Sequence, residues 1–150
     1  MNEREIIYVD DDSDDLLFFE DIARKLNIRT ALYQYPQEVM ARFESSQPLP
    51  DLIFVDLNMP LISGKDLVCN LRKMNVEVPM IILTTTADSF SIPKVRACGA
   101  NYLITKPTSL EGWETAISHA LSIDWKNFDP DVHGFVYDLG KNKSVRPVSE

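Results

Sequence analysis

The sequence predicts an α/β fold with a doubly wound, five-stranded parallel sheet and helices on both faces. Short apolar runs rich in β-branched residues end in polar residues, and each is followed by a stretch with helical character. That alternation is typical of parallel sheets whose strands are buried on both sides. A chain of 150 residues with 45% hydrophobic content can bury one core of ordinary size, so we expect one domain plus a tail.

Apolar runs supply the predicted strands, and the second run is weaker than the others because it is less apolar and ends before Pro36. The predicted strands cover residues 6–9, 30–35, 52–55, 80–83 and 102–105. Amphipathic stretches between them supply the helices. The predicted helices cover residues 14–26, 37–46, 64–74, 92–99 and 108–123. The fourth helix should be short, since Pro93 lacks an amide donor and fits only near a helix start, and Gly99 is a natural stop.

Composition narrows the possible roles. The formal net charge of −8 opposes binding to nucleic acid, whose affinity for proteins depends on Lys and Arg. No apolar run is long enough for a membrane span, and the N-terminal stretch does not resemble a signal peptide. Cys69 and Cys98 form no zinc-binding pattern with each other or with histidines. We therefore expect a cytoplasmic protein in which both cysteines are reduced thiols.

Polar residues follow the predicted strands, at the edge where ligands of open parallel sheets bind. These residues are Asp10, Asp11, Asp56, Thr84 and Lys106. Neighbouring carboxylates repel each other and stay ionised only beside a cation, and Mg²⁺ is the hard cation that usually meets this need. A lysine and a threonine beside them can hold phosphoryl oxygens. The set predicts phosphoryl transfer to a carboxylate.

Four segments in this order carry a family resemblance. They are the acidic pair after the first strand, LIFVDLNMPLISG, IILTTT and GANYLITKP. With them the chain resembles the response-regulator receiver family over residues 5–123. The resemblance implies a flavodoxin-like sheet with strand order 2-1-3-4-5. It also implies two-component phosphorelay signalling, in which a receiver passes on a signal by changing conformation when it is phosphorylated.

The resemblance implies a role for each of the site residues. Asp56 would accept a phosphoryl group from a histidine kinase. Asp11 would bind Mg²⁺ directly with help from Asp10, and Asp56 and the backbone carbonyl of Asn58 would complete the metal site. Taken alone, the acidic run at 10–15 would also suit a capped helix start. The prediction of a phosphorylation site therefore depends on all the strand-end residues together.

Thr84 and Lys106 would contact the phosphoryl group. The implied protein is a stand-alone response regulator, whose only chemistry is its own Mg²⁺-dependent phosphorylation and dephosphorylation. Its partners would be a histidine kinase or phosphotransfer protein and an unknown downstream protein target, without nucleic acid or membrane, and a homodimer stays open.

A haloacid-dehalogenase-like phosphatase is the alternative interpretation. Asp10 and Asp12 form a DxD motif after a strand, with Asp10 as nucleophile, and Thr84 and Lys106 would take the other family positions. This alternative leaves Asp56 and the segment after it without a role.

Two features depart from the usual receiver pattern. Leu103 stands where the family usually has an aromatic residue, and Tyr102 should point to the opposite face of the sheet. Residues 1–123 are the predicted receiver domain, and residues 124–150 form an aromatic-containing tail. We expect this tail to pack on the domain, to pair as a strand or to contact a second subunit.

Overall fold

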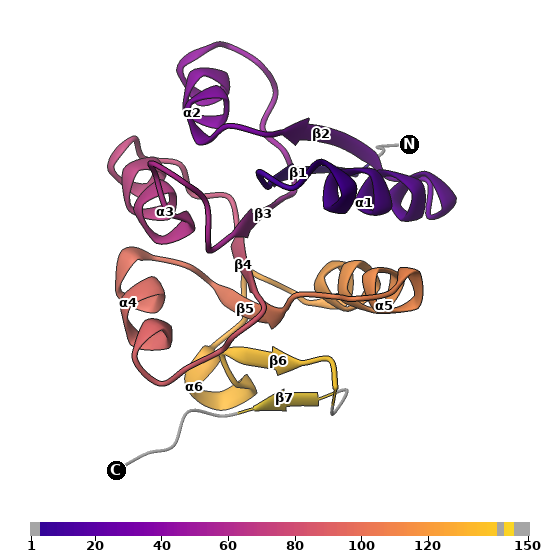
Figure 1. Ribbon diagram of the computed structural model, residues 1–150. Coiled ribbons are helices and arrows are strands. Elements are labelled where there is room, and N and C mark those ends of the chain that lie inside the picture. The colour runs from indigo at the N-terminus through magenta and orange to yellow at the C-terminus, as the bar shows by residue number, and fades with distance from the viewer. Residues whose placement is uncertain (1–3, 141–142, 146–150) are drawn as a thin grey trace.

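The structure is a computed structural model that describes residues 4–140 and 143–145. Its strands form one twisted sheet in the order β2-β1-β3-β4-β5-β6-β7 (Figure 1). All neighbouring strands are parallel except β6 and β7. The strands are β1 (Glu5–Val9), β2 (Arg29–Tyr33), β3 (Leu52–Asp56), β4 (Met80–Thr84), β5 (Tyr102–Thr105), β6 (Val136–Asp138) and β7 (Lys143–Val145). The predicted fold class and the order of the first five strands are confirmed, and two further strands extend the sheet.

Helices cover both faces of the sheet. Figure 1 shows α1 and α5 on one face and α2, α3 and α4 on the other. The helices are α1 (Ser13–Lys25), α2 (Pro36–Glu44), α3 (Gly64–Lys73), α4 (Ser91–Cys98), α5 (Leu110–Ser122) and α6 (Pro130–His133). None of the helices in the described part of the chain is long and apolar enough to cross a membrane.

Helix α4 is short, as the sequence predicts. Pro93 lies in its first turn, where an amide donor would have no partner within the helix. The helix ends at Gly99, whose φ of 110° is a left-handed conformation that glycine adopts without a steric penalty. Val95 is its one buried residue, so α4 attaches to the sheet through little apolar surface.

The core has two layers, one on each face of the sheet. Because side chains alternate along a strand, Tyr102 packs in the layer under α1 and α5, whereas Leu103 packs in the layer under α3 and α4. Both side chains are fully buried. The predicted opposition of these two residues is therefore confirmed.

Residues after α5 pack on the same sheet. Trp125 and Phe128 lie edge-on to the ring of Tyr102, at 5.8 and 5.4 Å between ring centroids. The buried Phe135 accepts a hydrogen bond at its carbonyl from the amide of Leu103, at 2.8 Å. Strand β6 then pairs with β5. The described residues after α5 therefore both contact the core and extend the sheet by a strand.

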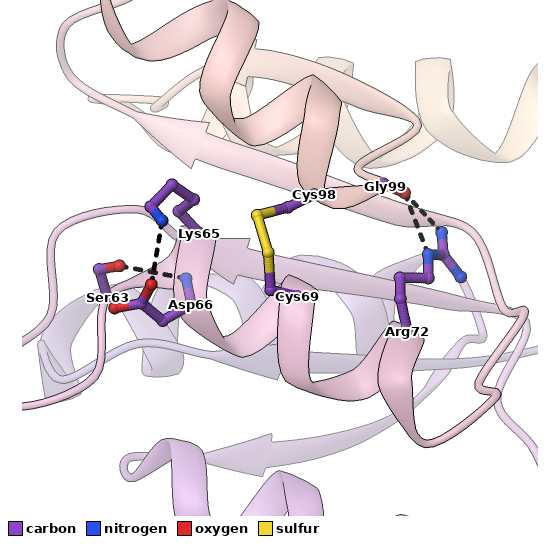
Figure 2. Close-up of a disulfide and its surroundings, with 7 residues drawn as sticks. All are labelled: Ser63, Lys65, Asp66, Cys69, Arg72, Cys98 and Gly99. Carbon is purple, nitrogen blue, oxygen red and sulfur yellow. Dashed lines mark hydrogen bonds and ion pairs between the residues drawn. A yellow bond between two sulfur atoms is a disulfide. The ribbon is translucent and has the colours of Figure 1, made fainter.

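The prediction that both cysteines are reduced is wrong for this structure. Cys69 on α3 and Cys98 on α4 are joined by a disulfide, with their Cα atoms 4.7 Å apart (Figure 2). The residues are 29 positions apart in the chain, and no local pattern indicates the bond. It becomes possible because α3 and α4 cover the same face of the sheet side by side.

Candidate functional site

Backbone hydrogen bonds align the carboxyl ends of the central strands. Asp56 and Thr84 are the last residues of β3 and β4. The amide of Lys106, which follows β5, donates to the carbonyl of Thr84 at 2.8 Å. The amide of Asp10, which follows β1, donates to the carbonyl of Tyr33 at 3.0 Å. The predicted site residues on β1, β3, β4 and β5 therefore meet at one edge of the sheet.

Three of the predicted metal ligands come together. One carboxylate oxygen from each of Asp10, Asp11 and Asp56 lies within 4.8 Å of the other two. Asp10 and Asp56 are buried and Asp11 is exposed. Such a set of oxygen donors, open on one side, suits a hard divalent cation. Asn58, the fourth predicted ligand, is exposed in the loop after β3.

Lys106 is the cation of this cluster. Its Nζ lies 2.8 Å from Asp10 Oδ2, 2.8 Å from Asp15 Oδ2 and 3.5 Å from Asp56 Oδ1. Burial alone would lower the pKa of Lys106, but the hydrogen bonds to Asp10 and Asp15 outweigh it and the pKa is raised. Lys106 therefore stays protonated at neutral pH beside the Asp56 carboxylate.

Asp56 sits in an environment that opposes its ionisation. Burial, followed by the negative charge of Asp10, raises the pKa of Asp56 to about 7, although the charge of Lys106 acts in the other direction. A carboxylate acts as a nucleophile only when ionised. A cation bound among Asp10, Asp11 and Asp56 would favour that ionised form.

Thr84 is buried and its hydroxyl belongs to a local turn. Thr84 Oγ1 donates to the carbonyl of Thr86 at 3.0 Å and accepts from the Thr86 amide at 3.2 Å. The hydroxyl therefore forms hydrogen bonds with the loop that leads to α4. Its predicted contact with a phosphoryl group requires a change of partner.

Sequence reasoning missed two members of the site, Tyr8 and Asp15. The buried Tyr8 hydroxyl donates to Asp10, and burial followed by the charge of Asp10 raises the pKa of Tyr8. Tyr8 precedes Asp10 by two residues, so strand alternation could have placed both on one face. Asp15 lies in the first turn of α1, close in sequence to the acidic pair, but no sequence pattern indicates its contact with Lys106.

The comparisons with known proteins agree with this geometry. The sequence matches the response regulator receiver domain family over residues 6–118, which is most of the chain. The chain therefore belongs to the receiver domain family of two-component response regulators, as the resemblance predicted.

Curated relatives include the transcriptional regulatory protein PhoP of Escherichia coli O157:H7, 32% identical over 71 residues, which are 47% of this chain and 32% of PhoP. The sensor protein EvgS of Escherichia coli K12 is 34% identical over 80 residues, which are 53% of this chain and 7% of EvgS. This chain thus spans less than half the length of these curated relatives.

Solved structures with the same fold include the chemotaxis response regulator CheY4 of Vibrio cholerae. Its TM-score is 0.69 at 20% identity, covering 79% of this chain and 98% of CheY4. A CheY-like receiver domain protein from Methanospirillum hungatei JF-1 has a TM-score of 0.69 at 22% identity, covering 80% of this chain and 94% of that one. At these identities the likeness shows the fold.

The phosphatase alternative is not favoured. Asp10, its nucleophile, has both oxygens engaged, because Oδ1 accepts from the Asp12 amide at 2.9 Å and Oδ2 contacts Tyr8 and Lys106. Asp12, the second acid of the DxD motif, caps α1 by accepting from the amides of the first turn. Asp12 is therefore outside the acidic cluster, which contains Asp10, Asp11 and Asp56.

Proposed function

We propose that this protein is a stand-alone response regulator that accepts a phosphoryl group from a histidine kinase or phosphotransfer protein on Asp56. The observation that carries the proposal is the cluster of Asp10, Asp11 and Asp56 oxygens within 4.8 Å, with the Lys106 ammonium 3.5 Å from Asp56. A nucleophile, acidic residues for a cation and a fixed positive charge are the parts that phosphoryl transfer to a carboxylate needs.

Asp10, Asp11 and Asp56, with the backbone carbonyl of Asn58, would hold Mg²⁺, which when bound offsets the negative charge of the carboxylates and of the incoming phosphoryl group. An oxygen of Asp56 forms the bond to phosphorus while the bond from phosphorus to the donor's leaving group breaks. Lys106 then balances the added charge on Asp56.

The conformational signal begins at Thr84. Its hydroxyl leaves Thr86 and donates to a phosphoryl oxygen on Asp56, which moves the loop leading to α4. A downstream protein target would bind the shifted conformation. The acidic net charge favours a protein over nucleic acid as this target, and the proposed location is the cytoplasm.

In the part of the chain that the structure describes, β6 and β7 extend the receiver sheet. The chemistry of the proposed regulator would be limited to gaining and losing its own phosphoryl group.

Incubation with a small acyl phosphate and Mg²⁺ tests the proposal. We expect an acid-stable, alkali-labile phosphoryl adduct, seen as a mass increase of the whole chain. The adduct should be absent from Asp56→Asn and present in Asp21→Asn, which removes an exposed carboxylate of α1. Chelation of Mg²⁺ should also prevent it.

Turnover of phosphate esters that persists in Asp56→Asn and disappears in Asp10→Asn would overturn the proposal in favour of a phosphatase.

A further inference from the structure

The disulfide joins the only two cysteines of the chain, and it links two helices on the α3 and α4 face of the sheet. Cys69 lies in the middle of α3, and Cys98 is the last residue of α4 (Figure 2). Both residues are only partly buried. With no third cysteine in the chain, Cys69 and Cys98 are the one pair that can form a disulfide within it.

The bond holds a helix that buries little apolar surface of its own. Val95 is the one buried residue of α4, and Phe90 at its N-cap offers no capping side chain. Asp88 accepts hydrogen bonds from the amides of Phe90 and Ser91, but all of these contacts are exposed or local. Ile92 packs against the core and Arg96 Nη2 donates to Asp131 Oδ1 at 2.7 Å, so the covalent link to α3 adds to a small set of contacts that hold α4.

A second contact keeps the two sulfur atoms close when the bond is open. Arg72 on α3 donates from Nε and Nη2 to the carbonyl of Gly99, at 3.0 and 2.8 Å (Figure 2). Its Nη1 donates to the carbonyls of Val76 and Val78, at 2.7 and 3.0 Å, so the guanidinium is itself fixed. The end of α4 thus stays beside α3, and closure of the dithiol is intramolecular.

We propose that Cys69 and Cys98 form a reversible thiol–disulfide couple that exchanges with small-molecule disulfides of the glutathione class, and that the couple sets the mobility of α4. In the oxidising direction a Cys thiolate attacks the small disulfide, forms a mixed disulfide and releases one small thiol. The second Cys thiolate then attacks the mixed disulfide and displaces the second small thiol. Two cysteine thiols and one small disulfide thus become one protein disulfide and two small thiols.

The position of the couple connects it to the phosphorylation site, a step that rests on the function proposed above. Helix α3 begins at Gly64, whose amide donates to the carbonyl of Leu57 directly after Asp56. Helix α4 follows the loop that holds the Thr84 hydroxyl. Tying α3 to α4 resists movement of that loop, so the disulfide disfavours the phosphorylated conformation. By reciprocity, phosphorylation favours the dithiol.

Equilibration of the whole protein in buffers of reduced and oxidised glutathione, with alkylation and mass measurement, tests the couple. We expect folded protein to titrate between dithiol and disulfide within this range. On reduction, hydrogen exchange in α4 should rise about fivefold or more while exchange in α1 and α5 is unchanged. The matched variant Cys69→Ser/Cys98→Ser should show the exchange of reduced protein at every redox setting.

Two outcomes would contradict the proposal of a reversible couple that sets the mobility of α4. One is a disulfide that opens only when the protein unfolds or that never forms in excess oxidised glutathione. The other is reduction that leaves exchange in α4 unchanged. Neither measurement involves phosphorylation, so both test the couple independently of the role of Asp56.

The connection to the site has its own test. The titration is repeated with Mg²⁺ and trifluoroberyllate, a phosphoryl mimic. The equilibrium constant should shift toward the dithiol about tenfold, which corresponds to a change of about 30 mV in the reduction potential of a two-electron couple. A mimic that binds without shifting the thiol–disulfide equilibrium would contradict the coupling to the phosphorylation site, but it would not contradict the reversible couple itself. Absence of any mimic binding would instead count against the proposed function.

Discussion

At the residue scale, two opposed effects act on the ionisation of Asp56. It is almost fully buried among carboxylates, which disfavour the ionised form, and it lies beside Lys106, which favours it. Its pKa of about 7 in the folded protein is above the ordinary value of 3.8. The folded state therefore holds this proton more tightly than the unfolded state. The resulting contribution to stability is complete below about pH 4 and is lost as the pH rises through 7.

The variant Asp56→Asn should accordingly be more stable than the parent at pH 8 without divalent cations. We expect a gain of about 1–3 kcal/mol in the free energy of unfolding, because the buried charge is gone. At pH 5, where Asp56 is mostly neutral, the difference should shrink. Urea denaturation at both pH values measures it.

The exposed Asp21→Asn serves as the control and should change little at either pH. Addition of Mg²⁺ should raise the stability of the parent at pH 8 more than that of Asp56→Asn. A parent that is as stable at pH 8 as at pH 5 would contradict the raised pKa.

Gly64 allows a second prediction about a single residue. A Cβ at this position would lie 2.4 Å from the carbonyl oxygen of Asp56 and 2.8 Å from the Cα of Leu57, both backbone atoms. Gly64→Ala should therefore push α3 away from the phosphoacceptor loop. We expect a loss of about 1–3 kcal/mol in the free energy of unfolding and slower adduct formation.

The matched substitution is Gly112→Ala in α5. There the nearest atoms belong to side chains, Ser109 Oγ at 3.2 Å and Pro107 Cβ at 3.3 Å, the backbone Pro107 Cα is 3.7 Å away, and alanine favours the helix. Melting temperatures of the two variants should separate, with Gly64→Ala clearly lower. Equal melting temperatures would mean that α3 can shift without cost.

The positions of single residues were predictable where a strand end alone decides them. Asp10, Asp56, Thr84 and Lys106 each follow or end an apolar run, so the topology brings them together without any knowledge of packing. The bond from Lys106 to Asp15 was not predictable, because it depends on how α1 is placed against the loop after β5. The partner of the Thr84 hydroxyl depends on the conformation of a loop in the same way.

At the scale of elements, the C-terminal segment is anchored to β5 by Phe135. This side chain is fully buried in the layer under α3 and α4, and its carbonyl accepts from Leu103. Phe135→Ala should lower the free energy of unfolding by about 3–4 kcal/mol, because it leaves a cavity beside β5. Denaturation of the purified variant measures the loss.

Val132→Ala on α6 is a suitable comparison, because Val132 is half-exposed. Its effect should stay within about 0.5 kcal/mol. A similar loss in both variants would mean that the segment contributes through α6 and not through Phe135.

Strand β6 lay beyond what sequence periodicity can show. It has three residues, Val136–Asp138, and a run this short gives no measurable alternation. The long helices and the first five strands were predictable because each repeats its apolar pattern over several residues. The disulfide was not predictable from the sequence for another reason, since only the packing of α3 beside α4 brings the cysteines together.

For the whole molecule, truncation after residue 123 provides a test of how the tail contributes. Removal of the tail takes away Trp125, Phe128 and Phe135, which cover Tyr102 and Leu103 in the two core layers. We expect a lower melting temperature in a calorimetric scan, because these apolar surfaces become exposed to water.

Mass in solution, measured for the full chain and the truncated one, addresses the homodimer. A full chain that has the mass of a dimer, while the truncated form has the mass of a monomer, would assign the tail to a subunit contact as well. An unchanged melting temperature would contradict the role of the tail in the core.

The position of β5 inside the sheet limits how another protein can recognise this molecule. One side of β5 is hydrogen-bonded to β4 and the other to β6, so its backbone is no longer available along either side. A partner that binds by adding its own strand has no place to do so at β5. Recognition near α4 and α5 must then depend on side chains, which makes it more sensitive to single substitutions than backbone pairing would be.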